Sequence, residues 1–244
     1  MKVLVLVKGV AAPGTQPLAD DGCLEGVDQV LDHYSKYALE AGLQLIQEDD
    51  QGSVTVASYG AGAETALRDA LALGAQDAVL VTTNQKHPRL GQVFATVVDR
   101  SGPFDLVLCG DQASDDSQGV LPAQVAAALG WPLIDLVDEL GMNGARLAYL
   151  SSLDQGTVKG TVQLPAVVAV TDTINKPRLP SFKLKMAAKR FQIKENRVES
   201  DGVDALESLG LETMPASNKS VRMVDTVDEL IQGLDQVGIR LRKE

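Results

Sequence analysis

Residues 104–119 have the sequence FDLVLCGDQASDDSQG, in which an apolar run passes into a polar loop with two glycines. The run Phe104–Leu108 is typical of a strand that is buried on both faces of a helix-covered parallel sheet. An Ala-rich segment follows Gly119 and extends to Leu129, which predicts a helix. Because a strand, a glycine-containing loop and a helix in this order begin a crossover unit, the stretch indicates an α/β fold.

The same alternation of short apolar runs and helical patterns extends over the first 130 residues. Such alternation is typical of a parallel sheet whose strands are joined by crossover helices. We therefore expect an α/β fold with a parallel-core sheet flanked by helices. The expected strands are 2–8, 53–58, 77–82 and 104–109, and the expected helices are 34–48, 63–73, 90–100 and the segment from Gly119 to Leu129.

After Trp131-Pro132 the pattern changes to β runs punctuated by glycine, which predict an antiparallel extension of the same sheet. From Asn175 onward the regular apolar pattern fades, which indicates an arm that leaves the body. A final amphipathic helix is expected from Val227 to about Arg240, and it would pack on its own body or on a partner. The expected strands of the extension are 145–151, 157–163 and 166–171.

Charge and cysteine content work against several classes of function. The 244 residues carry a formal net charge of -11, which repels nucleic acid and anionic membranes. Cys23 and Cys109 are too few for a disulfide framework or a four-cysteine metal site. No apolar stretch reaches the length of a bilayer, and the apolar start at residues 1–8 is too short for a signal peptide. We expect a soluble, cytoplasmic protein that neither binds nucleic acid nor inserts into a membrane.

The loop after the quoted strand is the first candidate binding site, because ligands of open α/β sheets bind at the carboxyl ends of strands. Gly110 and Gly119 permit a close approach, while Ser117, Gln118 and amides at the helix start could hold phosphate oxygens. The acidic pair Asp115-Asp116 works against an anion site unless these side chains bind ribose hydroxyls or cap the helix. A nucleotide site and a capped surface loop remain the two interpretations.

Other motifs carry little chemistry. The two histidines, His33 and His87, lie in no catalytic or metal-binding pattern, and we expect them to be surface residues. The sequence contains neither a Gly-x-Ser-x-Gly elbow nor a Walker-type loop. The turn Gly60-Ala61-Gly62 could present amides to a phosphate, but Thr65 replaces the expected third glycine, which favours a bare strand-to-helix turn.

The segment 176–194 is rich in basic residues and contains no acidic one, which is unusual in a chain of net charge -11. A solvated face, a nucleic-acid patch and a docking segment for an acidic protein surface are the three interpretations. Phe182, Leu184 and Met186 alternate with the charges, and apolar anchors inside a charged rim favour docking. The basic residues are Lys176, Arg178, Lys183, Lys185, Lys189, Arg190 and Lys194.

The octapeptide INKPRLPS at 174–181 and further segments follow one ordered pattern along nearly the whole chain. The further segments are Val3–Lys8, Tyr37–Ala41, Ala70–Ala75, Asp105–Ala113, Leu129–Pro132 and Leu164–Val168. In this order and spacing they resemble the β subunit of the electron transfer flavoproteins. The octapeptide is similar to the family signature that leads into a partner-recognition loop.

The resemblance implies an adenine-nucleotide α-hydrolase-like fold and a heterodimer with a larger α subunit, which holds most of a redox FAD. It implies an electron carrier without catalytic residues, not an enzyme. The carrier would accept electrons from a flavin-dependent dehydrogenase and pass them toward the respiratory chain, with a membrane quinone oxidoreductase as acceptor. Residues 1–174 would form the nucleotide-binding α/β domain, and 175–244 the recognition loop and a C-terminal arm with its terminal helix.

Two alternatives stay open. In ordinary members of this family the β subunit holds a structural AMP, whereas in electron-bifurcating members it holds a second FAD. The chain could therefore be a bifurcating subunit with its own FAD. It could also be a nucleotide-binding regulatory or stress-type protein that shares the α/β core.

The resemblance also assigns binding residues, and this chain departs from the family pattern among them. Asp32-His33-Tyr34-Ser35 stands where members have Asn-Pro-Phe/Tyr-Asp/Glu, and Gln118-Gly119-Val120 stands for a Thr-Gly-Gln-like element, so AMP, FAD or no nucleotide could be bound. The recognition loop differs from the usual Leu-Pro-Asn-Ile-Met, which indicates a partner other than the common acyl-CoA dehydrogenases. The implied nucleotide contacts are Leu6, Asp32, His33, Tyr34, Ser35, Tyr59, Gly110, Asp111, Gln112, Ala113, Ser114, Asp115, Asp116, Ser117, Gln118, Gly119, Val120 and Leu121, and the implied partner contacts are Phe182, Lys183, Leu184, Lys185 and Met186.

Overall fold

The computed structural model describes residues 1–13, 27–47, 49–85, 87–199 and 221–239. Cys23 and the expected helix end at Arg240 lie outside these residues. The chain separates into two compact units, Met1–Gly210 and Leu211–Glu244. Every strand named below belongs to the first unit.

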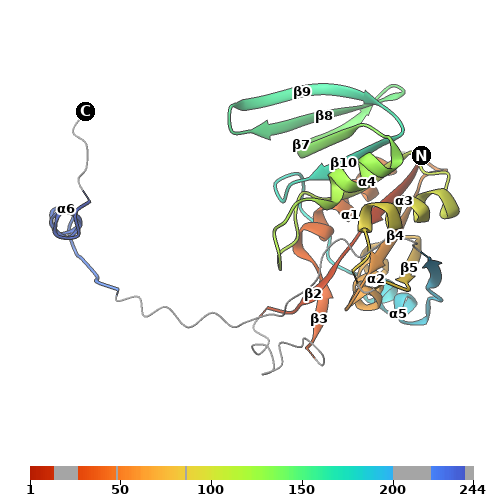
Figure 1. The fold of residues 1–244 in the computed structure, drawn as a ribbon, viewed down its shortest axis with the longest axis horizontal. Coiled ribbons are helices and arrows are strands. Elements are labelled where there is room, and N and C mark those ends of the chain that lie inside the picture. The colour runs from red at the N-terminus through yellow and green to blue at the C-terminus, as the bar shows by residue number, and fades with distance from the viewer. Residues whose placement is uncertain (14–26, 48, 86, 200–220, 240–244) are drawn as a thin grey trace. The chain divides into compact units, whose positions relative to one another are not determined.

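The first unit is built on a sheet that has nine strands within the described residues, in the order β11-β5-β4-β1-β6-β10-β7-β8-β9 (Figure 1). From β11 to β7 every pairing is parallel, and β8 and β9 continue the sheet with antiparallel pairings. The expected α/β fold with a parallel core and an antiparallel extension is confirmed. The strands are β1 (Lys2–Leu6), β4 (Ser53–Tyr59), β5 (Asp77–Thr83), β6 (Leu106–Gly110), β7 (Leu133–Asn143), β8 (Arg146–Leu153), β9 (Gly156–Gln163), β10 (Ala166–Val170) and β11 (Lys194–Val198).

Helices cover both faces of the parallel core, as the unbroken apolar strands require. Val3 and Val5 of β1 belong to the apolar cluster that contains residues of α1 and α2. Leu4 and Leu6 belong to the second cluster, which contains residues of α3 and α4. Alternate side chains of the same strand therefore pack against opposite helical layers. The helices are α1 (His33–Leu45), α2 (Ala63–Leu73), α3 (Leu90–Ser101) and α4 (Leu121–Leu129), and a separate antiparallel pair consists of β2 (Gly9–Ala11) and β3 (Gln29–Leu31).

The segment after α4 corrects one sequence-based expectation. Residues 166–171 were expected in the antiparallel extension, but β10 inserts between β6 and β7 and is parallel to both. All five residues of β10, with the sequence AVVAV, are buried. An unbroken apolar run is what a strand covered on both faces requires, whereas an extension with one solvated face would alternate. Strand β7, which the sequence did not predict, supplies the outer parallel neighbour.

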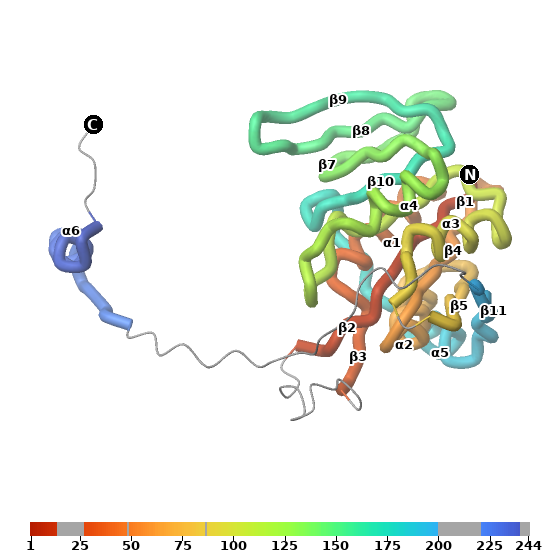
Figure 2. The backbone as a smooth tube through the Cα atoms, viewed as in Figure 1, coloured from red at the N-terminus to blue at the C-terminus, as the bar shows by residue number. Residues whose placement is uncertain are grey.

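The segment that follows residue 174 stays with the body instead of leaving it. Figure 2 shows α5 (Phe182–Arg190) beside α2 and β11 beside β5. The Nη1 atom of Arg68 on α2 donates to the carbonyl oxygens of Ala188 at 2.8 Å and Lys189 at 3.4 Å, and Ala188 is buried. The described residues 175–199 therefore belong to the first compact unit. The sequence analysis did not predict the edge strand β11, because its sequence KENRV is polar.

The second unit contains α6 (Val227–Gln236) among its described residues. Thr226 caps its amino end by accepting from the amide of Glu229 at 3.2 Å. The expected final helix is therefore present, though it ends earlier than about residue 240. In the described part of the chain, no helix has the length and apolar character needed to cross a membrane.

An ion pair fastens the start of the later segment to α1. Arg178 donates from Nε to Glu40 Oε2 at 2.7 Å and from Nη2 to Oε1 at 3.0 Å, and its backbone amide donates to Oε2 at 3.2 Å. The Glu40 side chain is 7% exposed, whereas that of Arg178 is 44% exposed. Burial alone would raise the pKa of Glu40, but the bonds from Arg178 outweigh it and lower this pKa below its ordinary value of 4.5.

We predict that Arg178→Ala lowers the free energy of unfolding by about 2 kcal/mol, because it leaves the buried Glu40 carboxylate without its cation. This figure lies below that of a fully buried pair because Arg178 is partly solvated. Since the folded pKa of Glu40 is lowered, the pair's contribution is present above the unfolded pKa and is lost as pH falls through the folded value. Urea unfolding between neutral and acid pH measures both effects. The neighbouring Lys176→Ala is the control, and equal stability of the two variants would contradict the role of the pair.

Candidate functional site

The candidate site lies where the order of the sheet reverses. β1 has β4 on one side and β6 on the other, so successive crossovers run in opposite directions from it. In doubly wound sheets, ligands bind outside the carboxyl ends of strands at such a switch point. The structure brings the segment 32–35, the loop 110–121 and Lys8 together at this place through side-chain contacts. Most of the residues that the resemblance assigned are therefore neighbours.

Asp32 joins two of these segments. Its side chain caps α1, where Oδ2 accepts from the Ser35 amide at 3.0 Å and the Ser35 hydroxyl at 3.3 Å. Its other oxygen, Oδ1, accepts from the Ser114 amide at 2.9 Å and the Ser114 hydroxyl at 2.7 Å. Asp32 is only 1% exposed. Both carboxylate oxygens are therefore used by the chain itself, and they hold the loop after β6 against the start of α1.

Lys8, which the sequence analysis did not assign to the site, forms the second link. Its Nζ donates to Asp115 Oδ1 at 2.7 Å and to Asp116 Oδ2 at 3.0 Å, and its backbone amide donates to the Ser35 hydroxyl at 3.1 Å. Burial would lower the pKa of Lys8, but the two aspartates outweigh it and raise this pKa. Its place immediately beyond β1, at the carboxyl edge of the sheet, was the signal that could have identified it.

The remaining loop residues pack closely. Gln112 donates from Nε2 to the Tyr34 hydroxyl at 2.7 Å. A Cβ on Gly110 would lie 2.6 Å from the Cβ of Tyr34, so the space left by this glycine is filled by α1. At Gly119, which has a φ of 62°, a Cβ would lie 3.0 Å from the Asp111 carbonyl oxygen. Ser117 also has a positive φ, of 49°, which a tightly folded loop imposes.

Asp111 is the residue of the site whose side chain has an unfilled hydrogen-bonding position. Its Oδ1 atom is buried and has no hydrogen-bond partner among the described residues. Burial, the charge of Asp135 and that of Asp172 raise the pKa of Asp111 above its ordinary value. His33 lies beside this acidic group, with its Nε2 3.8 Å from Asp172 Oδ2. The arrangement places negative charge at the carboxyl ends of β6 and β10.

Two of the assigned residues face elsewhere. The Leu6 side chain is buried in the apolar core beside α3 and α4, so only its backbone can reach the site. Tyr59 ends β4 and lines a separate cavity with Gln29, Gly60 and Gly62. The Leu6 side chain therefore contributes no polar group to the cluster around Asp32.

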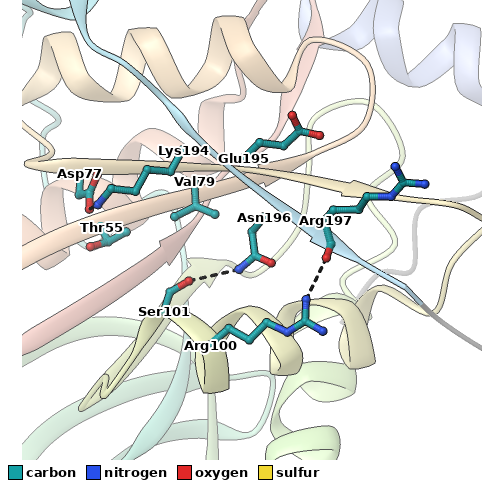
Figure 3. Close-up of a pocket in the computed structure, with 9 residues that line it drawn as sticks. All are labelled: Thr55, Asp77, Val79, Arg100, Ser101, Lys194, Glu195, Asn196 and Arg197. Carbon is teal, nitrogen blue, oxygen red and sulfur yellow. Dashed lines mark hydrogen bonds and ion pairs between the residues drawn. The ribbon is translucent and has the colours of Figure 1, made fainter.

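A cavity of about 530 Å³ lies at the opposite, amino end of the strands, between β11 and α3 (Figure 3). Its charged and polar groups mostly bind one another. Lys194 pairs with Asp77 at 2.6 Å, Asn196 donates to Ser101 at 3.3 Å, and Arg100 donates to the Arg197 carbonyl oxygen at 2.8 Å. We assign no chemistry to this cavity, because Lys194 and Arg100 are already engaged.

The residues that the structure describes also provide neither a metal site nor a reactive thiol. No group of three or more ligating side chains that could hold a metal ion occurs among them. Cys109 is buried in β6, and burial together with Asp135 and Asp111 raises its pKa to about 12. Its thiol therefore stays protonated and is a poor nucleophile at neutral pH.

We predict that Asp32→Asn lowers the free energy of unfolding by about 2 kcal/mol, because an amide nitrogen replaces one acceptor and faces N–H and O–H donors. Urea unfolding of the purified protein measures this change. Asp99→Asn on the exposed side of α3 is the control and should change the stability by less than about 0.5 kcal/mol. Equal effects of the two substitutions would show that the Asp32 contacts do not hold the loop.

Comparisons with known proteins point to one family. The family model for the electron transfer flavoprotein domain matches residues 23–201. Relatives named electron transfer flavoprotein subunit beta include that of Mycobacterium leprae (strain TN), which is 32% identical over 222 residues, or 86% of this chain and 83% of the relative. The Syntrophomonas wolfei protein is 31% identical over 194 residues, 78% of this chain and 77% of the relative. The Thermoanaerobacterium thermosaccharolyticum protein is 32% identical over 225 residues, 88% and 85% of the two chains. The chain belongs to the electron transfer flavoprotein family, among its β subunits.

Proposed function

We propose that the chain pairs with a larger α subunit to form a heterodimeric electron carrier and performs no substrate chemistry of its own. The carrier accepts electrons from a flavin-dependent dehydrogenase and passes them toward a membrane quinone oxidoreductase. FAD, held mainly by the α subunit, supplies the redox chemistry when bound. Membership of the family supports the flavin association, and the surface of α5 supports the docking role.

The observation that carries the docking role is the exposure of the apolar residues of α5. Ala188 is the buried residue of this helix, whereas Leu184, four residues before it, is 38% exposed. Phe182 and Met186, also four residues apart, are exposed, and Phe182 is 81% exposed. Ser181 caps the helix by accepting from the Leu184 amide at 3.2 Å. The apolar anchor is therefore presented by a helix fixed to α2 and not by a loose loop.

Basic residues surround these anchors. Lys185 and Lys189 fall at helical spacing on the same side as Phe182 and Met186, and all four residues are exposed. An apolar anchor with a cationic rim fits a partner surface that has an apolar pocket bordered by carboxylates. We propose that this surface belongs to the dehydrogenase. A solvated basic face would not need the exposed Phe182.

The second unit supplies a surface for the α subunit. Val227, Leu230, Ile231 and Leu234 recur at the spacing of one helical face of α6, and the first three are exposed. Isolated helices of this length are marginal in water, so packing against another surface is needed to stabilise them. We propose that this apolar face packs against the α subunit.

We predict that the isolated chain is colourless and poorly stable, and that co-expression with the α subunit yields a 1:1 yellow complex. Gel filtration, absorbance and flavin counting measure this outcome. One flavin per heterodimer supports the ordinary carrier, whereas two support the bifurcating alternative. A stable monomer that carries flavin without an α subunit would contradict the assignment.

Ile231→Asp should lower the yield of the yellow complex, because it places a charge on the apolar face of α6. Gln232→Asp, one position away and exposed on the same helix, is the matched control and should leave the yield unchanged. Co-purification of the two subunits measures both variants. Equal yields would exclude the α6 face from the subunit contact.

Phe182→Ala should leave flavin content and heterodimer formation unchanged but weaken docking to the dehydrogenase roughly thirtyfold, which corresponds to about 2 kcal/mol. Lys183→Ala should mainly slow association and alter its salt dependence. Electron transfer at limiting carrier concentration, measured at several ionic strengths, separates the two effects. If electron transfer by Phe182→Ala is unchanged, the docking role is wrong and the basic segment 176–194 is a solvated face.

A further inference from the structure

The site formed by Lys8, the segment 32–35 and the loop 110–121 at the carboxyl ends of the strands is called the strand-end site below. The family resemblance implies an AMP or a second FAD there, but the site differs chemically from a phosphate site. The loop 110–121 contains Asp111, Asp115 and Asp116 and no basic residue, and Asp32 lies against it. The cation that reaches the loop, Lys8, already binds Asp115 and Asp116. A nucleotide phosphate would therefore meet several carboxylates and a lysine that is already neutralised.

Several backbone amides of the loop are also engaged. The Ser114 amide donates to Asp32, the Ser117 amide to the Ala113 carbonyl oxygen at 2.9 Å, and the Gln118 amide to Asp116 Oδ1 at 3.2 Å. Pro122 near the start of α4 has no amide hydrogen to offer. These three loop amides and the missing amide of Pro122 are therefore not available to an anion.

The glycines of the loop leave no cradle for a ligand. Tyr34 fills the space beside Gly110, and the Asp111 carbonyl oxygen fills the space beside Gly119. The hydrogen bond from Gln112 to the Tyr34 hydroxyl continues this packing over the end of β6. Both glycines therefore serve contacts within the chain, and the residues present do not fit an adenine nucleotide.

We propose that this chain closes its strand-end site with its own contacts and binds no nucleotide there. The Asp32–Ser114 hydrogen bonds and the ion pairs from Lys8 to Asp115 and Asp116 join the loop to β1 and α1, which is the connection that a buried structural nucleotide would otherwise make. This inference deepens the proposed function, since it concerns the nucleotide site of the same subunit, but it depends on the contacts of this chain and not on the flavin.

The nucleotide content of the purified heterodimer tests the proposal. After denaturation, mass spectrometry of the supernatant should show one FAD per heterodimer and no stoichiometric AMP. One equivalent of AMP, or a second FAD, would overturn the closed site. A complex that contains neither FAD nor AMP would support the closed site and contradict the carrier function, so the two failures are distinguishable.

Thermal unfolding of the complex tests the ion pairs. Lys8→Met should lower Tm by about 2 °C in the otherwise unchanged chain, because Asp115 and Asp116 then repel each other without a cation. In a chain that also carries Asp115→Asn and Asp116→Asn, the same substitution should have almost no effect. Lys159→Met on the exposed part of β9 is the matched control. Equal losses in both backgrounds would overturn the proposed role of Lys8.

Added AMP gives an independent readout. A ligand that binds the folded state raises Tm with its concentration. Millimolar AMP should therefore leave the Tm of the unsubstituted complex and of the Lys8→Met complex unchanged. A rise in Tm of the unsubstituted complex would show an open site and would overturn the proposal.

Discussion

Strand β1 pairs in parallel with β4 on one edge and with β6 on the other, and the rest of the first unit depends on this central position. Its residues Val3, Leu4, Val5 and Leu6 are buried, and burying each side chain of this size contributes roughly 1.5–3 kcal/mol before chain entropy is considered. Because crossovers in parallel sheets are right-handed, strands added on opposite edges place their helices on opposite faces. The two apolar clusters follow from that rule.

The same arrangement brings the carboxyl ends of β1 and β6 together and creates the crevice that other α/β proteins use for ligands. In this chain, several charged side chains at the crevice bind one another or nearby groups of the chain. Asp32 bridges α1 and Ser114, while Lys8 bridges β1 and the acidic pair Asp115-Asp116. A topological switch point therefore provides a place where a ligand can bind. The charges at the strand ends decide whether a ligand or side chains of the chain itself occupy that place. Here the balance of charge is acidic, which disfavours phosphate.

The surface used for partners depends on how the segment after residue 174 is fixed. Arg178 binds the buried Glu40 carboxylate, Arg68 binds the end of α5, and β11 pairs with β5. These contacts hold α5 on the first unit, so its exposed Phe182 is presented with less entropy loss than a free loop would require. In the other compact unit, α6 has an apolar face with no such anchorage among its own described residues. The two apolar surfaces are therefore suited to different partners.

The sequence by itself determined the parallel core, because unbroken apolar strands alternating with helical periods admit few other folds, and its ordered segments identified the family. It also located the loop at 110–121 and the exposed apolar residues of α5. Only the tertiary structure decided that β10 lies between β6 and β7, that the polar strand β11 completes the sheet, and that Lys8 meets Asp115 and Asp116. Local patterns record whether a residue is buried, but not which distant charge it meets. The pairing of Lys8 with aspartates more than 100 positions away arises only when two strands place their ends side by side.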